Sequence, residues 1–347
     1  MVNARALLVT GGAGFIGSGY VRYLLRNALA DRIHVLDKLT YSGNPTTLDS
    51  FSDDPRVEFI EGDICDPATV NHAVDGCDAI VNFAAETHVD RSLFDPAEFI
   101  QTNVQGTLVL LDAARERTGT RFVQVSTDEV YGAVLDGYSR ESDPLYPRNP
   151  YSASKAGAEM LAISYAETHG VDVVITRGSN TYGPFQYPEK FIPLMITNLF
   201  ERKAVPVYGD GLQVRHWVHV DDHCSGIDTA LRFGASGEIY NVGSDDERTN
   251  LEVVKQVLSL VDAPEDLITH VADRPGHDRR YALSSEKLRR IGWEPKRAFD
   301  EGIADTVRWY RENRDWWEPI RDGSFQEYYR RNYDNRDQAH PGARREG

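Results

Sequence analysis

The sequence has few cysteines, and they are widely spaced. Cys65, Cys77 and Cys224 are the three cysteines among 347 residues. An odd number without C-x-x-C spacing argues against a disulfide framework and against a zinc site. We therefore expect a protein of the reducing cytoplasm that holds no metal.

The sequence also lacks long apolar runs and a surplus of basic residues. No apolar run reaches about 18 residues, the length typical of a membrane-spanning helix, and the N-terminus has no signal-peptide pattern. Lys and Arg number 38 against 54 Asp and Glu, a net charge of −16. Nucleic-acid binders usually carry a basic surplus, so we expect neither nucleic acid nor a membrane as a partner. An acidic protein can still bind a small anion where a few Arg or Lys line one cleft.

Short apolar segments alternate with segments of helical periodicity in the first half of the chain. We expect strands at 7–10, 33–36, 57–60, 79–83, 122–126 and 173–176, and helices at 15–27, 97–115 and 151–168. Such alternation is typical of parallel strands joined by right-handed crossovers. The predicted fold class is therefore α/β, a Rossmann-like doubly wound parallel sheet with a smaller C-terminal substrate lobe.

The pattern changes after about residue 177. Pro184, Pro188, Pro193 and Pro206 interrupt it, and the helical segments become shorter. We predict a first domain over 1–177, a second lobe over 178–333 and a loose, charged tail over 334–347. The apolar segment 239–242 could return to the first sheet, which would make the boundary discontinuous.

A glycine-rich motif lies between the first strand and the first helix. Residues 11–17, GGAGFIG, fit G-x-x-G-x-x-G. Gly11 permits the tight turn, Gly14 lets the backbone approach a pyrophosphate, and Gly17 lets the helix pack on the sheet. The helix N-terminus then offers N–H groups and a partial positive charge to the phosphates. Asp37 ends the second strand at the distance where an acid holds the ribose hydroxyls, which favours NAD over NADP.

Tyr151 and Lys155 stand four residues apart on a predicted helix, so they share one face. A nearby ammonium stabilises a phenolate, and we therefore expect it to lower the pKa of Tyr151 and make it a general base. Ser126, at the end of a strand, could hydrogen-bond the same substrate oxygen.

Two adjacent acids, Asp128 and Glu129, follow the same strand. Neighbouring side chains in an extended segment diverge, so one could act as acid and the other as base at two substrate atoms. Their repulsion tends to raise one pKa and to keep that acid protonated.

The glycine loop, Ser126 and the Tyr151-x-x-x-Lys155 pair together resemble the extended short-chain dehydrogenase/reductase family. The resemblance implies an N-terminal NAD-binding lobe and a C-terminal nucleotide-sugar lobe. Within that family, STDEVYG at 126–132 looks like the signature of the dTDP-glucose 4,6-dehydratases. Further motifs agree, at 37–40, 84–92, 102–107, 180–184, 188–190 and 273–278, and the resemblance runs from about residue 6 to 319.

The resemblance implies a catalytic set of Thr127, Asp128, Glu129, Tyr151 and Lys155. In such enzymes Tyr151 would take the proton of the sugar 4-hydroxyl while NAD takes the C4 hydride. Glu129 would then remove the C5 proton, and Asp128 would protonate the departing 6-hydroxyl. The hydride would then return to C6 and C5 would regain a proton, so NAD is regenerated and is expected to stay bound.

The resemblance also assigns binding residues. Cofactor-binding positions are Gly11, Gly14, Phe15, Ile16, Gly17, Asp37, Lys38, Leu39, Thr40, Asp63, Ile64, Ala84, Ala85, Glu86, Thr102, Ser126, Tyr151, Lys155 and Thr181. Substrate-binding positions are His88, Thr127, Asn180, Lys190, Phe191, Pro206, Val207, Tyr208, Arg215, Asn250, Arg274 and His277. Arg215 and Arg274 are expected to grip the diphosphate, because a guanidinium can bind two phosphate oxygens at once.

Three positions depart from the family pattern. His216 stands where an acidic residue is common, and Gly178 and Thr181 stand where Cys and Asn are frequent. By resemblance, all three line the cofactor or substrate pocket.

Other functions remain open from the sequence. A related dehydratase or epimerase could act on a UDP-linked or other nucleotide-sugar, although the acid pair argues against an epimerase. A non-enzymatic NAD sensor would be expected to lack Tyr151, Lys155 or the acids, and all are present. A homodimer is expected through the helices at 97–115 and 151–168, but Leu108 and Leu111 could equally be core residues. The deoxysugar pathway that the product feeds is open too.

Overall fold

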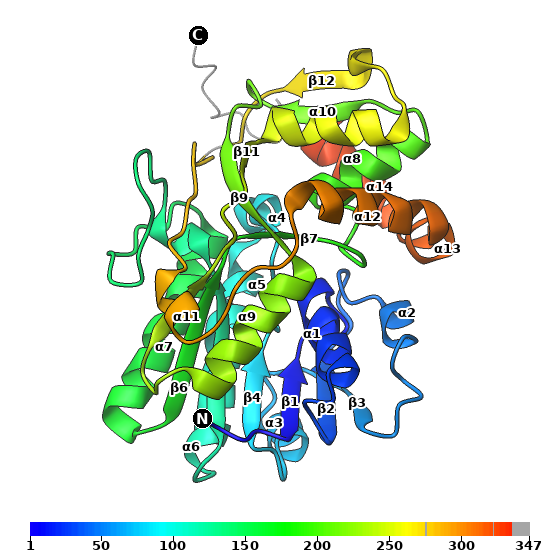
Figure 1. Cartoon of the computed structure of the whole chain (residues 1–347). Coiled ribbons are helices and arrows are strands. Elements are labelled where there is room, and N and C mark those ends of the chain that lie inside the picture. Colours follow the sequence, from blue (N-terminus) through cyan, green and yellow to red (C-terminus); the bar gives the residue numbers. More distant parts are fainter. Residues whose placement is uncertain (275, 322, 335–347) are drawn as a thin grey trace.

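A seven-stranded parallel sheet forms the centre of the first lobe (Figure 1). The structure, a computed structural model, describes residues 1–334 except 275 and 322, so the tail predicted at 334–347 lies outside the described residues from 335 on. In spatial order the strands are β10 (Ile239–Val242), β6 (Asp172–Gly178), β5 (Arg121–Thr127), β4 (Ala79–Asn82), β1 (Ala6–Thr10), β2 (Arg32–Asp37) and β3 (Val57–Glu61). The predicted strand at 239–242 is found in this sheet, parallel to β6.

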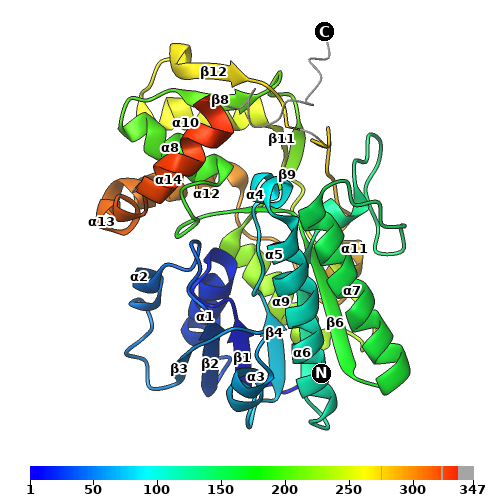
Figure 2. The ribbon, with the colours of Figure 1, turned by 180° about the vertical axis from the view of Figure 1, so that it is seen from behind.

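Helices cover both faces of the sheet, as the predicted doubly wound fold requires. On the face seen in Figure 1 lie α1 (Phe15–Arg26), α9 (Val220–Phe233) and α11 (Glu286–Arg290). Figure 2 shows the opposite face, covered by α3 (Pro67–Ala73), α6 (Gly106–Arg115) and α7 (Pro150–His169). Because both faces are covered, β1 and β4 are apolar and buried almost throughout.

The helix predicted at 97–115 is interrupted in the structure. It consists of α5 (Pro96–Ile100), a π-helical turn (Gln101–Gln105) and α6. Within the turn, the Asn103 side chain donates to the carbonyl of Glu86 and to Ser154 Oγ, at 3.1 and 2.8 Å. The prediction of one regular helix was wrong because a π-helical turn, which carries these tertiary hydrogen bonds, separates α5 from α6.

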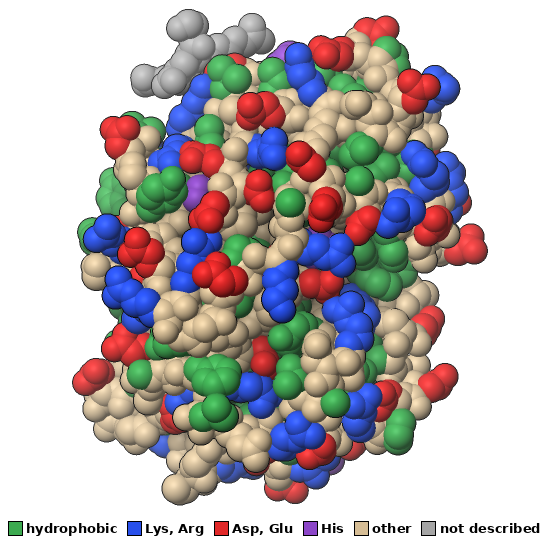
Figure 3. All heavy atoms as spheres, viewed as in Figure 1, with side chains coloured by type: hydrophobic (Ala, Val, Ile, Leu, Met, Phe, Trp, Pro, Cys, Tyr) green, Lys and Arg blue, Asp and Glu red, His purple; other side chains and the backbone are tan. Residues whose placement is uncertain are grey.

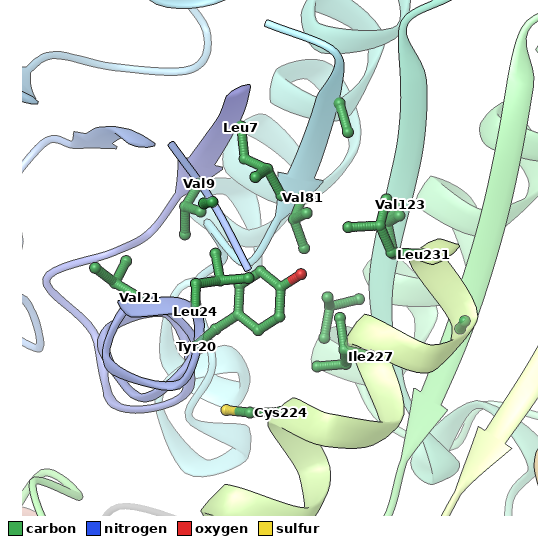
Figure 4. Packing of buried hydrophobic residues seen from close by; sticks show 14 of the residues in the cluster. Leu7, Val9, Tyr20, Val21, Leu24, Val81, Val123, Cys224, Ile227 and Leu231 are labelled. Atoms are coloured by element: carbon green, nitrogen blue, oxygen red, sulfur yellow. The ribbon is translucent and has the colours of Figure 1, made fainter. Parts of the chain in front are cut away.

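A hydrophobic cluster packs α1 and α9 against the sheet. Figure 4 shows the ring of Tyr20 lying among Leu24, Val81 and Ile227. The Tyr20 hydroxyl donates to Asp228 Oδ1 at 3.1 Å, so the buried phenol is satisfied. The cluster thereby joins the first helix to a segment more than 200 residues later in the chain.

The second lobe is built from smaller sheets and helices in the upper part of Figure 1. It contains β7 (Asn180–Tyr182), β8 (Val205–Tyr208), β9 (Val214–His219), β11 (Glu247–Thr249), β12 (Ile268–Val271), α8 (Phe191–Phe200), α10 (Asn250–Val261), α12 (Phe299–Glu312), α13 (Arg314–Trp317) and α14 (Gly323–Tyr329). The remaining short helices, α2 (Pro45–Leu48) and α4 (Val89–Phe94), lie in loops that follow strands β2 and β4. Trp316 Nε1 donates to Thr47 Oγ1 at 3.1 Å, so Trp316 packs between the lobes.

Charges of both signs are spread over the surface. On the face in Figure 3, Lys and Arg lie among Asp and Glu rather than in a basic stripe. Among the described residues, no helix combines the length and the hydropathy that crossing a membrane requires.

Leu24→Ala should lower the free energy of unfolding by about 2–5 kcal/mol, because it leaves a cavity in the buried cluster. Urea unfolding measures this change. The control Leu135→Ala removes the same atoms from a side chain that is 70% exposed, and it should change the free energy by less than about 0.5 kcal/mol. Equal effects of the two substitutions would contradict the packing described here.

Candidate active site

The predicted site residues gather at the carboxyl ends of the parallel strands. The cavity opens between β1 and β4, where the onward connections leave toward opposite faces of the sheet. This switch point is the usual ligand crevice of an open α/β sheet. The loops after β1, β2, β4, β5 and β6 all contribute to its walls.

The glycine loop packs closely against neighbouring backbone and leaves the N-terminus of α1 open. Gly11 has φ +67°, and a Cβ there would lie 2.6 Å from Ala84 N. A Cβ on Gly17 would collide with the carbonyl oxygen of Gly11. Gly14 is the N-cap of α1 and no side chain caps it, so the helix N-terminus is open to a phosphate.

Asp37 lies at the end of β2, where its carboxylate accepts backbone hydrogen bonds from Ala13 and Leu39 at 2.9 and 2.8 Å. Burial raises its pKa, although these two hydrogen bonds oppose the shift. Nearby, Lys38 Nζ donates to Thr102 Oγ1 at 3.2 Å. Asp37 therefore orders the glycine loop and lines the cavity at the same time.

Several buried polar atoms in the cavity wall have no hydrogen-bond partner among the described residues. These atoms include Ser126 Oγ, Ser179 Oγ and Asn180 Oδ1. Buried polar groups are normally satisfied. Together with the glycine cradle, these atoms make the cavity fit a polar, extended ligand such as a dinucleotide.

The two acids lie in a 3-10 turn, Asp128–Tyr131, directly after β5. Asp128 is 3% exposed, and its Oδ1 accepts from Thr127 Oγ1 at 3.2 Å. Burial, and then repulsion from Glu129, raise the pKa of Asp128 to about 7. The sequence predicted that one acid of the pair would stay protonated, and the structure indicates that this acid is Asp128.

A buried network holds this turn in place. The Tyr131 hydroxyl donates to Asn241 Oδ1 at 2.8 Å and accepts from the Arg177 guanidinium at 2.7 Å. Arg177 is in turn paired with Glu159 at 2.6 Å, and both side chains are buried. The turn that carries the acids is therefore tied to β6, β10 and α7.

The expectation of a lowered pKa for Tyr151 is wrong in this structure. Burial and the charges of Glu129 and Asp128 raise the pKa of Tyr151 well above its usual range, and a hydrogen bond with Thr127 opposes them only in part. Lys155 shares the helix face, but its Nζ donates to the carbonyl of Val125 at 2.7 Å. Burial also lowers the pKa of Lys155 to about 8, which reduces the charge it offers to the phenol.

A second cavity continues from the first toward the second lobe. Both cavities are lined by Glu129, Asn180, Thr181 and Lys190, so Glu129 of the acid pair lies at their junction. Lys190 Nζ donates to the carbonyl of Thr87 at 2.9 Å. The two openings together can hold one long ligand with the reacting atoms at Glu129.

Arg215 and Arg274 supply the positive charge of the second cavity. The Arg215 guanidinium donates to the carbonyl of Asp278 at 2.9 Å and lies 4.3 Å from the centre of the Tyr281 ring. Arg274 NH1 lies 4.0 Å from Asp90 Oδ1, and its own Nε has no hydrogen-bond partner among the described residues. Such guanidinium groups fit the oxygens of a diphosphate.

His88 lines this second cavity and does not titrate near neutrality. It is 7% exposed, and burial lowers its pKa to about 4. Its ring therefore stays neutral, in keeping with its predicted place in a binding wall.

Most predicted residues line the two cavities, but three do not. Leu39 points its side chain against the N-terminal core. Val207 is 1% exposed in the core of the second lobe. His216 was predicted to line a pocket, but it alternates with Arg215 along β9 and is buried with Nε2 3.7 Å from Glu247. The other two departures, Gly178 and Thr181, do line the first cavity.

The prediction missed several lining residues, which are Phe83, Gln186, Tyr187, Trp217, His223 and Tyr333. His223 comes from α9, and Thr181 Oγ1 lies 2.7 Å from its Nδ1. A Cβ at position 178 would collide with the His223 ring, so Gly178 makes room for it. The glycine at the end of a strand was the one local signal that a bulky group lies close by.

Comparisons with known proteins agree with this geometry. The family model of GDP-mannose 4,6 dehydratase matches residues 8–306. A dTDP-glucose 4,6-dehydratase of Streptomyces antibioticus is 52% identical over 321 residues, which cover 91% of this chain and 95% of the relative. The low-salt glycan biosynthesis protein Agl12 of Haloferax volcanii is 51% identical over 304 residues, covering 88% of this chain and 98% of that protein.

Among solved structures, the dTDP-glucose 4,6-dehydratase DesIV from Streptomyces venezuelae with NAD and TYD bound has a TM-score of 0.89 and 52% identity. The match covers 91% of this chain and 99% of DesIV. The fold and site define a nucleotide-sugar-modifying enzyme of the short-chain dehydrogenase/reductase type. The chain belongs to the GDP-mannose 4,6-dehydratase family.

Asp128→Asn should stabilise the protein more at about pH 8 than at about pH 5. The folded state keeps the Asp128 proton up to its raised pKa of about 7, whereas the unfolded chain releases it near its ordinary value. The wild type therefore loses stability as the pH rises through this window, by on the order of a few kcal/mol, and the amide does not. Urea unfolding at both pH values measures the difference.

Asp136→Asn, at an exposed position, is the matched control. It should show no comparable pH-dependent gain. A gain from Asp128→Asn that is equal at both pH values would contradict the raised pKa.

Proposed function

We propose that this protein is a dTDP-glucose 4,6-dehydratase, which converts dTDP-glucose to dTDP-4-keto-6-deoxyglucose. The observation that carries the proposal is the acid pair beside Tyr151, in which Asp128 is buried and Glu129 lies at the junction of the two cavities. The named functions of the relatives from Streptomyces support the same reaction.

NAD is the cofactor in this proposal, held by the glycine loop, by Asp37 and by the polar atoms at the ends of β5 and β6. When bound, it supplies a two-electron acceptor that can take a hydride from C4 of the sugar and return it to C6. Phe15 and Ile16 lie at the N-terminus of α1, where their backbone would face the phosphates.

The residues of the chain would move the protons. Tyr151 would take the proton of the 4-hydroxyl. For this step its pKa, which burial, Glu129 and Asp128 raise in the structure, must fall when the site is occupied. The ketone at C4 acidifies C5, and Glu129 removes that proton. Asp128, which its raised pKa of about 7 keeps partly protonated at neutral pH, donates its proton to the 6-hydroxyl, which leaves as water. C5 regains a proton as C6 is reduced. Thr127 holds Asp128 Oδ1 and hydrogen-bonds the sugar.

The acid pair also discriminates between related reactions. A 4-epimerase needs a base at the 4-hydroxyl but no acid at C6, so a buried protonated Asp128 would have no task there. A dehydratase that acts on a UDP-linked sugar would keep the same acids and differ at the base-binding end of the second cavity, near Pro206 and Tyr208. A dehydratase of a UDP-linked sugar is therefore the alternative to the proposed function.

The predicted organisation belongs to the same proposal. Residues 1–177, with later segments returning to their sheet, would hold NAD, and residues 178–333 would hold the nucleotide-sugar. A homodimer would form through α6 and α7, where Met160 is 48% exposed. The cysteines Cys65, Cys77 and Cys224 are free, which supports a cytoplasmic location.

Purified protein incubated with dTDP-glucose, without added reductant, should release one water per sugar and leave no net NADH. Mass spectrometry and the alkaline absorbance of the keto-sugar measure this. Asp128→Asn and Glu129→Gln should each lower the rate by about 100-fold or more, as expected for loss of a general acid or base. If the protein removes water from UDP-glucose but not from dTDP-glucose, the proposed reaction stands and the assigned substrate is wrong. If it reacts with no nucleotide-sugar, the proposed function is contradicted.

The rate of dehydration should fall above about pH 7, by up to about tenfold per pH unit, because Asp128 then loses the proton it must donate. Asp128→Asn should abolish this limb of the pH profile at a lower overall rate, whereas the exposed Asp136→Asn should keep it. Measuring kcat between about pH 6 and about pH 9 covers the transition. The same limb in Asp128→Asn would show that another group titrates.

A further inference from the structure

The C-terminal segment 323–334 packs against the second cavity. It consists of α14 and a π-helical turn, Arg330–Asp334, and it lies beyond residue 306, where the family match ends. Figure 2 shows α14 beside α8 and β8. Asn198 of α8 donates to the Tyr329 hydroxyl at 3.3 Å, which ties the two helices together. The segment is therefore part of the second lobe rather than an appendage.

Tyr328 anchors the segment to the loop after β4. Its hydroxyl lies 3.2 Å from His88 Nε2, and the two rings meet edge-on at 5.3 Å. The Arg91 guanidinium lies 4.6 Å from the centre of the Tyr328 ring and donates to Glu189 at 2.8 Å. The anchor thus reaches a predicted wall residue of the substrate cavity, His88.

Asn332 joins a buried hydrogen-bonded group that includes Tyr208. Its amide donates to the Tyr208 hydroxyl at 2.7 Å and reaches Asp90 Oδ2 at 3.4 Å. The Tyr208 hydroxyl in turn donates to the same Asp90 oxygen at 3.0 Å. Asn332 is fully buried and Asp90 is 2% exposed, so these bonds are shielded from water.

Tyr333 lines the second cavity and packs on Tyr208. The rings are stacked, 5.8 Å apart and 22° from parallel. His277 meets Tyr208 edge-on at 6.0 Å. Tyr208 is therefore held at its hydroxyl by Asn332, on one face by Tyr333 and at another side by His277.

We propose that Asn332 and Tyr333 are positioning residues of the nucleotide end of the substrate cavity, and that they hold Tyr208 where a nucleoside diphosphate binds. This inference rests on the proposed function for the identity of the ligand. The chemistry of the cavity supports that ligand, because Tyr208 and Tyr333 offer aromatic surface for a base. Arg274, whose NH1 lies 4.0 Å from Asp90, offers charge to the diphosphate.

The same contacts link the base end of the cavity to its charged part. Asp90 accepts from Tyr208 and lies beside Arg274, so a displaced Tyr208 would also disturb the carboxylate that holds the guanidinium. Displacement of Tyr208 should therefore lower the affinity for the nucleotide more than it lowers the rate of the reaction at Glu129, because Glu129 lies toward the cofactor cavity.

The test is the affinity for dTDP, measured by calorimetry on the protein with its NAD retained. Tyr333→Ala should weaken binding by about tenfold, the usual scale of one lost aromatic contact. KM for dTDP-glucose should rise by a similar factor, and kcat should fall by less than KM rises. Tyr333→Phe keeps the ring and should restore most of the affinity. Asn332→Ala should weaken dTDP binding in the same direction.

Glu327→Ala, at an exposed position of α14 in the same C-terminal segment, is the control and should bind dTDP like the wild type. Unfolding temperatures and NAD contents identify variants that fail to fold. If Asn332→Ala fails to fold, the dTDP affinities of Tyr333→Ala and Tyr333→Phe decide whether the inference holds. Wild-type affinity in Tyr333→Ala, or a loss that falls on kcat alone, would overturn the inference.

The proposed function can fail separately. If the wild type binds dTDP but does not dehydrate dTDP-glucose, the proposed reaction falls and the affinity series still decides this inference. If the wild type binds UDP instead, the same series with UDP decides it. If neither nucleotide binds, the inference falls as well.

Discussion

The close approach of two backbone segments, at Gly11 and Ala84, is the constraint on which both cavities depend. These residues follow the neighbouring strands β1 and β4, whose onward connections leave toward opposite faces of the sheet. A Cβ on Gly11 would lie 2.6 Å from Ala84 N, so a larger residue would push the two loops apart. The crevice above the strand ends exists because the connections after β1 and β4 leave toward opposite faces of the sheet. The loops that follow the other strands form its remaining walls.

Burial away from water shifts the pKa values of the ionisable side chains around this crevice. Burial disfavours the charged form of every group, so it shifts acids and bases in opposite directions. It raises the pKa of Asp128 to about 7, lowers that of Lys155 to about 8 and lowers that of His88 to about 4. One physical cause thus favours the neutral form of the Asp128 acid, of the Lys155 amine and of the His88 ring.

The second lobe can complete the site because it is tied to the first around the crevice. The Arg91 guanidinium donates to Glu189 at 2.8 Å, and the Arg22 guanidinium lies 4.0 Å from the centre of the Phe185 ring. These contacts join elements of the first lobe to the loop between β7 and α8, which also carries Lys190. The walls of the second cavity therefore keep a defined distance from the acid pair.

The sheet, the glycine loop and the identity of the acid pair could be predicted from the amino-acid sequence, because strand alternation and fixed spacings are local properties. It also predicted the Tyr151 and Lys155 pair, since residues four apart share a helix face. The three-dimensional packing shows which acid of the pair has the raised pKa, Asp128, and shows that Lys155 donates to a backbone carbonyl. The same packing reverses the expected pKa shift of Tyr151, because burial, Glu129 and Asp128 raise that pKa. It also brought Tyr333 to the substrate cavity from a segment with no motif. These features depend on burial and on contacts between segments far apart in the chain, and the local spacing of residues predicts neither.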